Sequence, residues 1–412
     1  MNIIERFLRY VSINTRSLVD SIEIPSSKGQ IELAKIIAKE LSLIVPDAKI
    51  NLTDQGLLIC QVPASLGFEN SAHVCLSAHF DTYYDQSGDV SPIIHDYQGG
   101  DLVLPKNNVV IPLSENQDLL KFIGSKIITA DGSSILGADD KAGLAGIVTA
   151  IELLTQQKRS HGPITLVFFP DEEISRFDFN SLPVDLANSW NVFWTIDGLE
   201  LGTIDQECFI ANNVTIIFKG VDAHPGVAGQ KLVPAHYAAC ALVNLLAQKP
   251  TPWQTSDRES YIYVDSIVGS APEAKVVCIP RSFESSEVKR LIKEIKSAVQ
   301  EVSKIYPKVN FTIEIKQLSQ NTLSAIEKKS WVLSPAKEAM RNHGYEPILR
   351  ACRAGTDGAM FNLIYPNIPA PDMGYGARNV HELHEWIPVK ELEVLPLIIA
   401  DMLVNYGVIK TN

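Results

Sequence analysis

Three short segments of the chain are almost continuously apolar. They are residues 73–78 (HVCLSA), 164–169 (ITLVFF) and 192–196 (VFWTI). Runs of this length and composition are typical of strands buried on both faces of a sheet that helices cover. Between the first two runs, apolar residues recur at helical spacing near 140–157 and predict a helix. The order strand, helix, strand predicts an α/β fold with a mostly parallel sheet.

A second and complete pattern occupies residues 211–322. Strands are expected at 214–219, 260–267, 274–280 and 309–317, and helices at 233–248 and 285–304. The resulting order, βαββαβ, is that of ferredoxin-like domains. Because this pattern interrupts the α/β pattern, we expect two domains. Residues 1–210 and 323–412 form the first, and residues 211–322 form an inserted second domain.

Composition excludes several classes of protein. Of the 412 residues, 46% are hydrophobic and 20% are charged, which excludes a disordered chain or a coiled coil. The net charge of −12, without any run of basic residues, argues against binding to nucleic acid or to anionic membranes. No apolar segment approaches the roughly 18 residues of a membrane-spanning helix. The six cysteines form no CxxC pair, so a reducing, cytoplasmic location is expected.

Acidic and histidine residues gather where predicted strands end. The segments are AHFDT (His79, Asp81), GADDKAG (Asp139, Asp140), PDEE (Asp171, Glu172, Glu173), TIDG (Asp197) and VHELHE (His381, His384). Carboxyl ends of strands face the ligand crevice of open α/β sheets. So many carboxylates need cations to share one crevice, and the imidazoles favour zinc or a similar metal. Each segment alone also fits a capping acid, an acidic turn or a solvated helix start, so both interpretations stay open on residue chemistry alone.

The order and spacing of these motifs resemble one enzyme family. The chain is similar to the co-catalytic zinc exopeptidases, which include peptidase T, succinyl-diaminopimelate desuccinylase and several aminoacylases, and most similar to the peptidase T group. The resemblance covers nearly the whole chain. It is carried by ERFLRYVSINTRS, IPSSKGQ, AHFDTYYDQSGDV, TADGSSILGADDKAG, HGPITLVFFPDEE, TIDG, VDAHPG, RSFE, RAGTDGA and HELHE.

The resemblance implies a catalytic domain with two Zn²⁺ ions per subunit, although Co²⁺ and Mn²⁺ also suit such ligands. The implied ligands are His79, Asp139 and Asp197 for one ion and Asp139, Glu173 and His381 for the other, with Asp139 bridging. The D-x-K pattern of the family selects Asp139 over Asp140, and the H-x-x-x-E pattern selects His381 over His384. The inserted domain is implied to be a lid, whose outer face forms dimers in relatives. A homodimer is therefore one expected assembly, although the sequence identifies no interface.

The implied activity is hydrolysis of the N-terminal amide bond of a short peptide by a water that bridges the metals. Glu172 matches the general base, and Asp81 matches the acid that orients His79. In the lid, His224 matches a residue that stabilises the oxyanion. Arg281 and Arg353 match positions that meet the carboxylate end of the substrate. Without the resemblance, His224 is better explained as a turn residue before Pro225, and each arginine as the partner of a surface acid.

Three departures from the peptidase T pattern leave the substrate open. The family has DGGG where this chain has DGLE at 197–200, and EGYEGF where it has DRESYIY at 257–263. Pro234 replaces an asparagine of the lid. An N-acyl-amino-acid or dipeptide hydrolase of the same family is therefore an alternative to a tripeptide aminopeptidase. A metal-dependent binding protein without catalysis is a further alternative.

Overall fold

The computed structural model describes residues 1–411, which form two compact units. The larger unit comprises residues 1–206, 324–350 and 365–412, and the smaller unit comprises residues 207–323 and 351–364. The smaller unit thus contains the segment expected to form an inserted domain. It also contains residues 351–364, which the sequence pattern placed in the larger domain.

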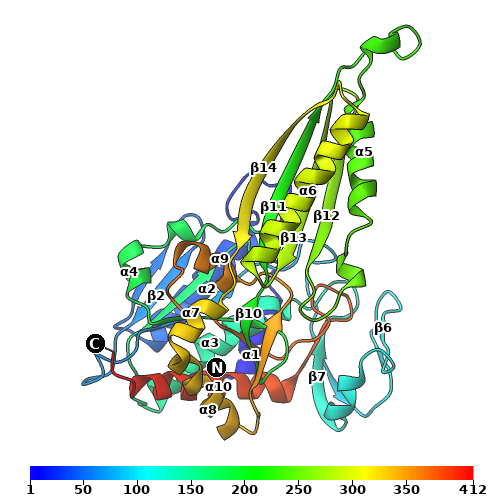
Figure 1. Ribbon diagram of the computed structural model, residues 1–412. Coiled ribbons are helices and arrows are strands. Elements are labelled where there is room, and N and C mark those ends of the chain that lie inside the picture. The colour runs from blue at the N-terminus through cyan, green and yellow to red at the C-terminus, as the bar shows by residue number, and fades with distance from the viewer. Residues whose placement is uncertain (412) are drawn as a thin grey trace. The chain divides into compact units, whose positions relative to one another are not determined.

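The larger unit is built around an eight-stranded sheet in the order β1-β2-β8-β3-β9-β16-β10-β15 (Figure 1). The strands are β1 (Lys49–Leu52), β2 (Leu58–Val62), β3 (Val74–His79), β8 (Ile164–Phe169), β9 (Val192–Gly198), β10 (Thr203–Cys208), β15 (Ile348–Cys352) and β16 (Asp372–Gly374). The central strands β8, β3, β9 and β16 run parallel, β2 and β10 join them antiparallel, and β1 pairs antiparallel with β2. The predicted α/β class is confirmed, and β3, β8 and β9 are the three strands expected from the apolar runs.

Helices with apolar faces cover this sheet. They are α1 (Ile3–Val11), α2 (Lys28–Ile44), α3 (Ala138–Gln156), α4 (Val184–Asn188), α7 (Leu323–Lys328), α8 (Ser334–Asn342) and α10 (Val389–Gly407). Helix α3 is buried along almost its whole length because it packs on β3 and β9 and is covered in turn by α1 and α10. The first turn of α3 therefore lies at the carboxyl ends of the parallel strands, where a crevice is expected.

Two small sheets lie beside the main sheet in the larger unit. One has the order β17-β7-β4, and the other pairs β5 with β6. The strands are β4 (Ile93–Tyr97), β5 (Leu102–Val103), β6 (Val110–Ile111), β7 (Ser125–Thr129) and β17 (Trp386–Pro388). The sequence pattern predicts no strand within residues 83–118, whereas β4, β5 and β6 form there. These strands are two to five residues long, too short to show an alternating pattern.

The smaller unit contains a four-stranded antiparallel sheet in the order β12-β13-β11-β14, with α5 and α6 on one face (Figure 1). The elements are β11 (Ile210–Lys219), α5 (Ala235–Leu246), β12 (Tyr261–Gly269), β13 (Glu273–Ser282), α6 (Ser285–Ile305) and β14 (Asn310–Ser319), followed later by α9 (Asp357–Ile364). The first and last strands of the βαββαβ order are neighbours, as in ferredoxin-like folds. Val214, Ile216 and Phe218 alternate along β11 and pack against the helices.

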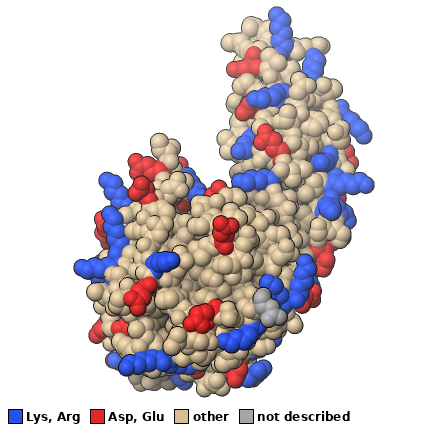
Figure 2. Space-filling view, turned by 90° about the vertical axis from the view of Figure 1, so that its left-hand side faces the viewer, with Lys and Arg blue, Asp and Glu red and all other residues tan. Residues whose placement is uncertain are grey.

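Residues 1–411 contain no candidate membrane-spanning helix, and the face drawn in Figure 2 has no basic patch. Within residues 1–411, no helix is long and apolar enough to cross a membrane. Figure 2 shows lysine and arginine side chains distributed among acidic ones rather than gathered together.

Candidate metal centre

Asp139 is the centre of the predicted site because its two carboxylate oxygens face different histidines. Oδ1 lies 3.0 Å from His79 Nε2, and Oδ2 lies 3.1 Å from His381 Nε2. Asp197 Oδ1 completes the first group at 3.6 Å from His79 Nε2, and Glu173 Oε1 completes the second at 3.0 Å from His381 Nε2. Zinc ligands at about 2.0–2.1 Å in tetrahedral geometry are separated by roughly 3.3 Å. Both groups therefore have the spacing of a metal site, and they share Asp139.

His79 ends β3 and is oriented by Asp81. Its Nδ1 lies 3.1 Å from the Asp81 carbonyl oxygen and 3.2 Å from Asp81 Oδ1. With the Nδ1 proton donated to these oxygens, Nε2 keeps its lone pair for a metal. The Asp81 carboxylate also accepts the backbone N–H groups of Glu172 and Glu173, each at 3.0 Å, and the Ser17 hydroxyl at 2.5 Å. One buried acid thus positions a ligand of each group and the predicted base.

Asp139 is held by Glu385, whose side chain is 1% exposed. The Glu385 carboxylate accepts the backbone N–H groups of Gly137 at 2.7 Å, Ala138 at 2.8 Å and Asp139 at 3.3 Å. These N–H groups begin α3 and have no partner within the helix, so a carboxylate satisfies them and favours the helix start. Glu385 is therefore a positioning residue for Asp139.

Replacing Glu385 by Gln should weaken metal binding about 10- to 100-fold, since the amide loses the charge and directs an NH₂ group at backbone donors. Competition with a fluorescent chelator measures this affinity. Glu393→Gln, at an exposed glutamate of helix α10, is the control and should bind metal as the unmodified protein does. Equal metal affinities in the two variants would show that Glu385 is not needed to position Asp139.

The neighbouring acid Asp140 has a structural role. Its Oδ1 accepts the Gly143 N–H at 3.1 Å, and its Oδ2 accepts the His79 N–H at 3.3 Å. A Cβ atom at Gly143 would lie 2.2 Å from Asp140 Oδ1, which explains the glycine in GADDKAG. Asp140 therefore caps the regular part of α3, while Asp139 faces the two histidines.

Asp197 ends β9 and is fixed by Asp372. Asp372 Oδ1 accepts the Asp197 N–H at 3.0 Å and the Thr195 hydroxyl at 2.7 Å. Asp197 Oδ1 itself is buried and accepts no hydrogen bond from residues 1–411. A buried carboxylate oxygen without a donor fits a metal ligand, because leaving it unpaired is costly.

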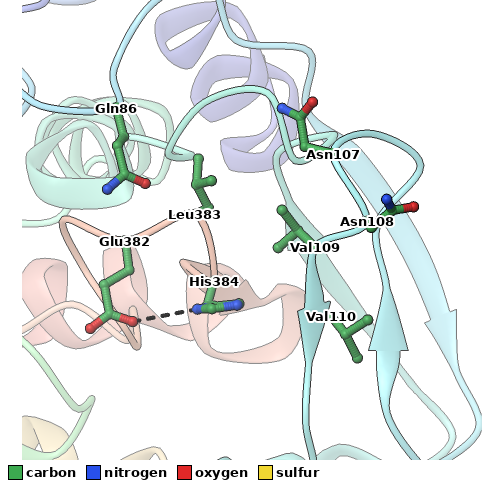
Figure 3. Close-up of a pocket in the computed structure, with 8 residues that line it drawn as sticks. All are labelled: Gln86, Asn107, Asn108, Val109, Val110, Glu382, Leu383 and His384. Atoms are coloured by element: carbon green, nitrogen blue, oxygen red, sulfur yellow. Dashed lines mark ion pairs between the residues drawn. The ribbon is translucent and has the colours of Figure 1, made fainter.

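His381 has a left-handed backbone (φ +68°) and stacks on Tyr83, with ring centroids 4.2 Å apart and planes 2° from parallel. His384 takes no part in either metal group. His384 Nδ1 lies 3.6 Å from Glu382 Oε2, and both residues line a different cavity of about 580 Å³ (Figure 3). The lining residues of that cavity are Gln86, Asn107, Asn108, Val109, Val110, Glu382, Leu383 and His384. The geometry thus favours His381 over His384.

The crowded acids shift one another's pKa values. Burial and the neighbouring charge of Asp139 raise the pKa of Glu173 to about 8. Burial raises the pKa of Glu172 to about 7. Burial alone would lower the pKa of His381, but hydrogen bonds with Asp139 and Glu173 raise it to about 10. Without a metal, protons therefore supply part of the positive charge that the carboxylates need.

Metal binding should therefore release protons at pH 7. His381 and Glu173 carry protons at this pH without a metal, and both must lose them to act as ligands. The apparent affinity should rise with pH up to about 8 through Glu173 and further, up to about 10, through His381. Calorimetry of Zn²⁺ binding in buffers with different ionisation enthalpies should show release of at least one proton per protein. Heats that do not depend on the buffer would contradict this charge balance.

The other predicted residues lie in the smaller unit. His224 is exposed in a turn, where its Nδ1 accepts the Gly226 N–H at 3.2 Å. Arg281 lies on β13, and its side chain makes no hydrogen bond or ion pair with residues 1–411. Arg353 donates to the carbonyl oxygens of Asp257 at 3.0 Å and Glu259 at 3.2 Å. Its guanidinium also donates to a threonine hydroxyl of the same loop at 2.7 Å, so its donors are engaged in holding that loop.

Four positioning residues of the site were not predicted in these roles. Ser17 contacts Asp81, Tyr83 stacks on His381, Asp372 holds Asp197 and Glu385 holds Asp139. Only Glu385 had a local signal, as the acid of the H-x-x-x-E pattern.

Comparison with known proteins identifies the family. The model of peptidase family M20/M25/M40 matches residues 135–405. A peptidase T from Caldanaerobacter subterraneus subsp. tengcongensis is 34% identical over 413 residues, which cover 98% of both chains. The chain belongs to peptidase family M20/M25/M40. The predicted family resemblance is confirmed, and so is the prediction of a peptide-hydrolysing enzyme.

Solved structures of M20 peptidases share the fold. Aminopeptidase PepT from Bacillus cereus superposes with a TM-score of 0.70 at 20% identity, and covers 98% of both chains. A tripeptidase from Staphylococcus aureus superposes with a TM-score of 0.72 at 18% identity, with the same coverage. At these identities the likeness concerns the fold, which agrees with the two-unit architecture of this M20 peptidase.

Proposed function

We propose that this M20 peptidase is a tripeptide aminopeptidase that holds two divalent metal ions, preferentially Zn²⁺. The observation that carries the proposal is the position of Asp139, which offers one oxygen to each histidine-containing group. A shared carboxylate between two such groups suits a pair of metals better than a single ion. The names of the relatives, peptidase T and tripeptidase, support the choice of substrate.

Two metal ions held by His79, Asp139, Asp197, Glu173 and His381 would polarise the scissile carbonyl and lower the pKa of the attacking water. Glu172 takes the proton from this water and returns it to the leaving amine. A pKa of about 7 lets the same carboxyl accept and donate a proton near neutral pH. The backbone N–H of Glu172 is held by Asp81, and a Glu172 carboxylate oxygen lies within 4.8 Å of an Asp197 oxygen. The base is thus fixed beside the metal ligands.

We also propose roles in substrate binding for three residues of the smaller unit. We assign His224 to the oxyanion, since its exposed imidazole can donate a hydrogen bond. Arg281 and Arg353 are assigned to the carboxylate end of the peptide. Arg281 is the better candidate of the two arginines, because Arg353 already donates hydrogen bonds to the 255–259 loop.

We further propose that the enzyme works in the cytoplasm, because all six cysteines are free thiols in the structure. A homodimer and the lack of nucleic-acid binding remain predictions.

The substrate assignment is tested with metal-reconstituted enzyme and a panel of free tripeptides, the matching dipeptides, N-acetylated tripeptides and N-acyl amino acids. Free tripeptides should have the highest kcat/KM, and N-acetylation should abolish cleavage. Preference for blocked N-termini would identify an acyl-amino-acid hydrolase instead. Tight binding without any turnover would identify a binding protein.

A further inference from the structure

We propose that Arg16, beside Tyr83 and Tyr84 in the larger unit, binds the C-terminal carboxylate of the peptide. This inference rests on the proposed aminopeptidase function. It gives the larger unit its own anchor for the end of the substrate, in addition to the arginines of the smaller unit.

Two tyrosines lead away from the metal ligand His381. The Tyr83 ring stacks on the imidazole at 4.2 Å, and the Tyr84 ring follows at 4.4 Å from Tyr83. The Tyr83 hydroxyl donates to the Tyr84 hydroxyl at 3.2 Å, so the two rings are linked. Each step is comparable with one residue of an extended peptide, about 3.3–3.6 Å. The rings therefore form a wall along which a short peptide can lie with its reacting carbonyl at the metals.

Arg16 contacts the backbone of Tyr84, the second tyrosine of this wall. Its Nε donates to the Tyr84 carbonyl oxygen at 2.6 Å, which fixes the plane of the guanidinium. The two terminal nitrogens carry four N–H donors, and none of these has an acceptor or an acidic partner among residues 1–411. A guanidinium with an unused fork of donors is suited to a carboxylate.

The guanidinium belongs to a cavity of about 570 Å³, which is large enough for the end of a peptide. The cavity is lined by Arg16, Ser17, Leu18, Val19, Asp20, Ser21 and Tyr84. Arg16 is the one basic residue of this set. Asp20 is exposed and forms no ion pair with Arg16, so the fork remains available.

Hydrogen bonds connect the cavity wall to the metal centre on one side and to Arg176 on the other. The Ser17 hydroxyl donates to Asp81, the acid that orients His79. Arg176 donates to the carbonyl oxygens of Val19 and Ser21. These contacts hold the 16–21 segment in place, so Arg16 keeps a fixed position relative to the metal ligands.

The cleavage site determines which carboxylate reaches Arg16. An aminopeptidase cleaves the first peptide bond, so the C-terminal carboxylate of a tripeptide lies two residues beyond the scissile carbonyl. In an extended chain this is about 7 Å. The ring steps of 4.2 and 4.4 Å are each somewhat longer than one extended residue, so two steps suffice for this span. A free C-terminus at this distance can therefore meet the unused donors of Arg16.

The test compares kcat/KM for one tripeptide with a free C-terminus and for the same tripeptide as a C-terminal amide. The ratio of the two values cancels any loss of correctly folded enzyme. We expect the ratio to fall about 10-fold in Arg16→Gln, through a higher KM for the free acid, and to recover in part in Arg16→Lys. Arg341→Gln, which removes a surface arginine paired with Glu346, should leave the ratio unchanged.

Further variants separate the alternatives. An unchanged ratio in Arg16→Gln, or a ratio lost only in Arg281→Gln, would overturn the proposal. A loss confined to peptides with an acidic side chain would also overturn it. Asp20→Asn should leave kcat/KM unchanged for both peptides, and an equal decrease for the two would show that the cavity binds the ammonium end instead. If the unmodified enzyme cleaves neither peptide, the proposed function fails rather than the role of Arg16.

Discussion

Glu172→Gln should lower kcat for tripeptide hydrolysis about 1,000-fold without loss of metal. The amide cannot take a proton from water, and a positioned general base contributes about 10²–10⁴-fold to rate. Binding of metal should persist, because Glu172 belongs to neither of the two groups that contain a histidine, and these comprise His79, Asp139, Asp197, Glu173 and His381. The amide also keeps the size of the side chain and leaves the backbone hydrogen bond to Asp81 in place. Steady-state kinetics with metal analysis by mass spectrometry measures both quantities.

The matched control is Glu338→Gln, an exposed glutamate on α8 of the larger unit, which should keep full activity. A Glu172→Gln enzyme with more than about a tenth of normal kcat would exclude Glu172 as the base. A loss of metal in that variant would instead assign it a ligand role.

Asp139→Asn should lower the metal content from two ions to one or none, and activity at least about 1,000-fold. Asparagine has one carbonyl oxygen in place of two carboxylate oxygens, so it cannot serve the His79 and His381 groups together. The removed negative charge also weakens the attraction of the site for both cations. Metal titration followed by activity assays measures the two effects.

Asp185→Asn, at an exposed acid of α4, provides the control and should bind two ions. Two tightly bound ions in Asp139→Asn would contradict a bridging role. A further comparison with the adjacent Asp140 is informative, because Asp140 caps α3 and its replacement should reduce stability more than metal stoichiometry.

The central strands, and the convergence of acidic and histidine residues at their ends, could be predicted because their signals are local and strong. Apolar runs marked β3, β8 and β9, and His79 and Asp197 end two of these strands. The ends of parallel strands meet at one edge of a sheet, so residues far apart in sequence converge there. The alternating pattern of β11 likewise identified the second sheet.

The supporting contacts could not be predicted, because they depend on distant segments. Glu385 reaches the start of α3 across 246 residues from Asp139, and Asp372 reaches Asp197 across 175. His381 stacks on Tyr83 and has a left-handed backbone, and no local pattern indicates either feature. The short strands β4, β5 and β6 form by pairing with each other or with the distant β7, and therefore also lack a local signal.

The assignment of residues 351–364 to the smaller unit has a similar cause. This segment lies near the end of the α/β pattern, but its contacts are with β14, through α9. The backbone N–H of Phe209 donates to the Ala354 carbonyl oxygen at 3.3 Å, and the backbone N–H of Gln320 donates to the Ala359 carbonyl oxygen at 3.0 Å. Such packing is a property of the tertiary structure, so hydrophobic periodicity alone could not place Arg353 in the smaller unit.

The proposed enzyme removes one residue from the N-terminus of a tripeptide and needs bound metal to do so. Mass spectrometry of the products from a tripeptide with three different residues identifies which bond is cleaved. We expect the free N-terminal amino acid and the C-terminal dipeptide, formed only when metal is present. Release of the C-terminal amino acid, or the same products from metal-free enzyme, would contradict it.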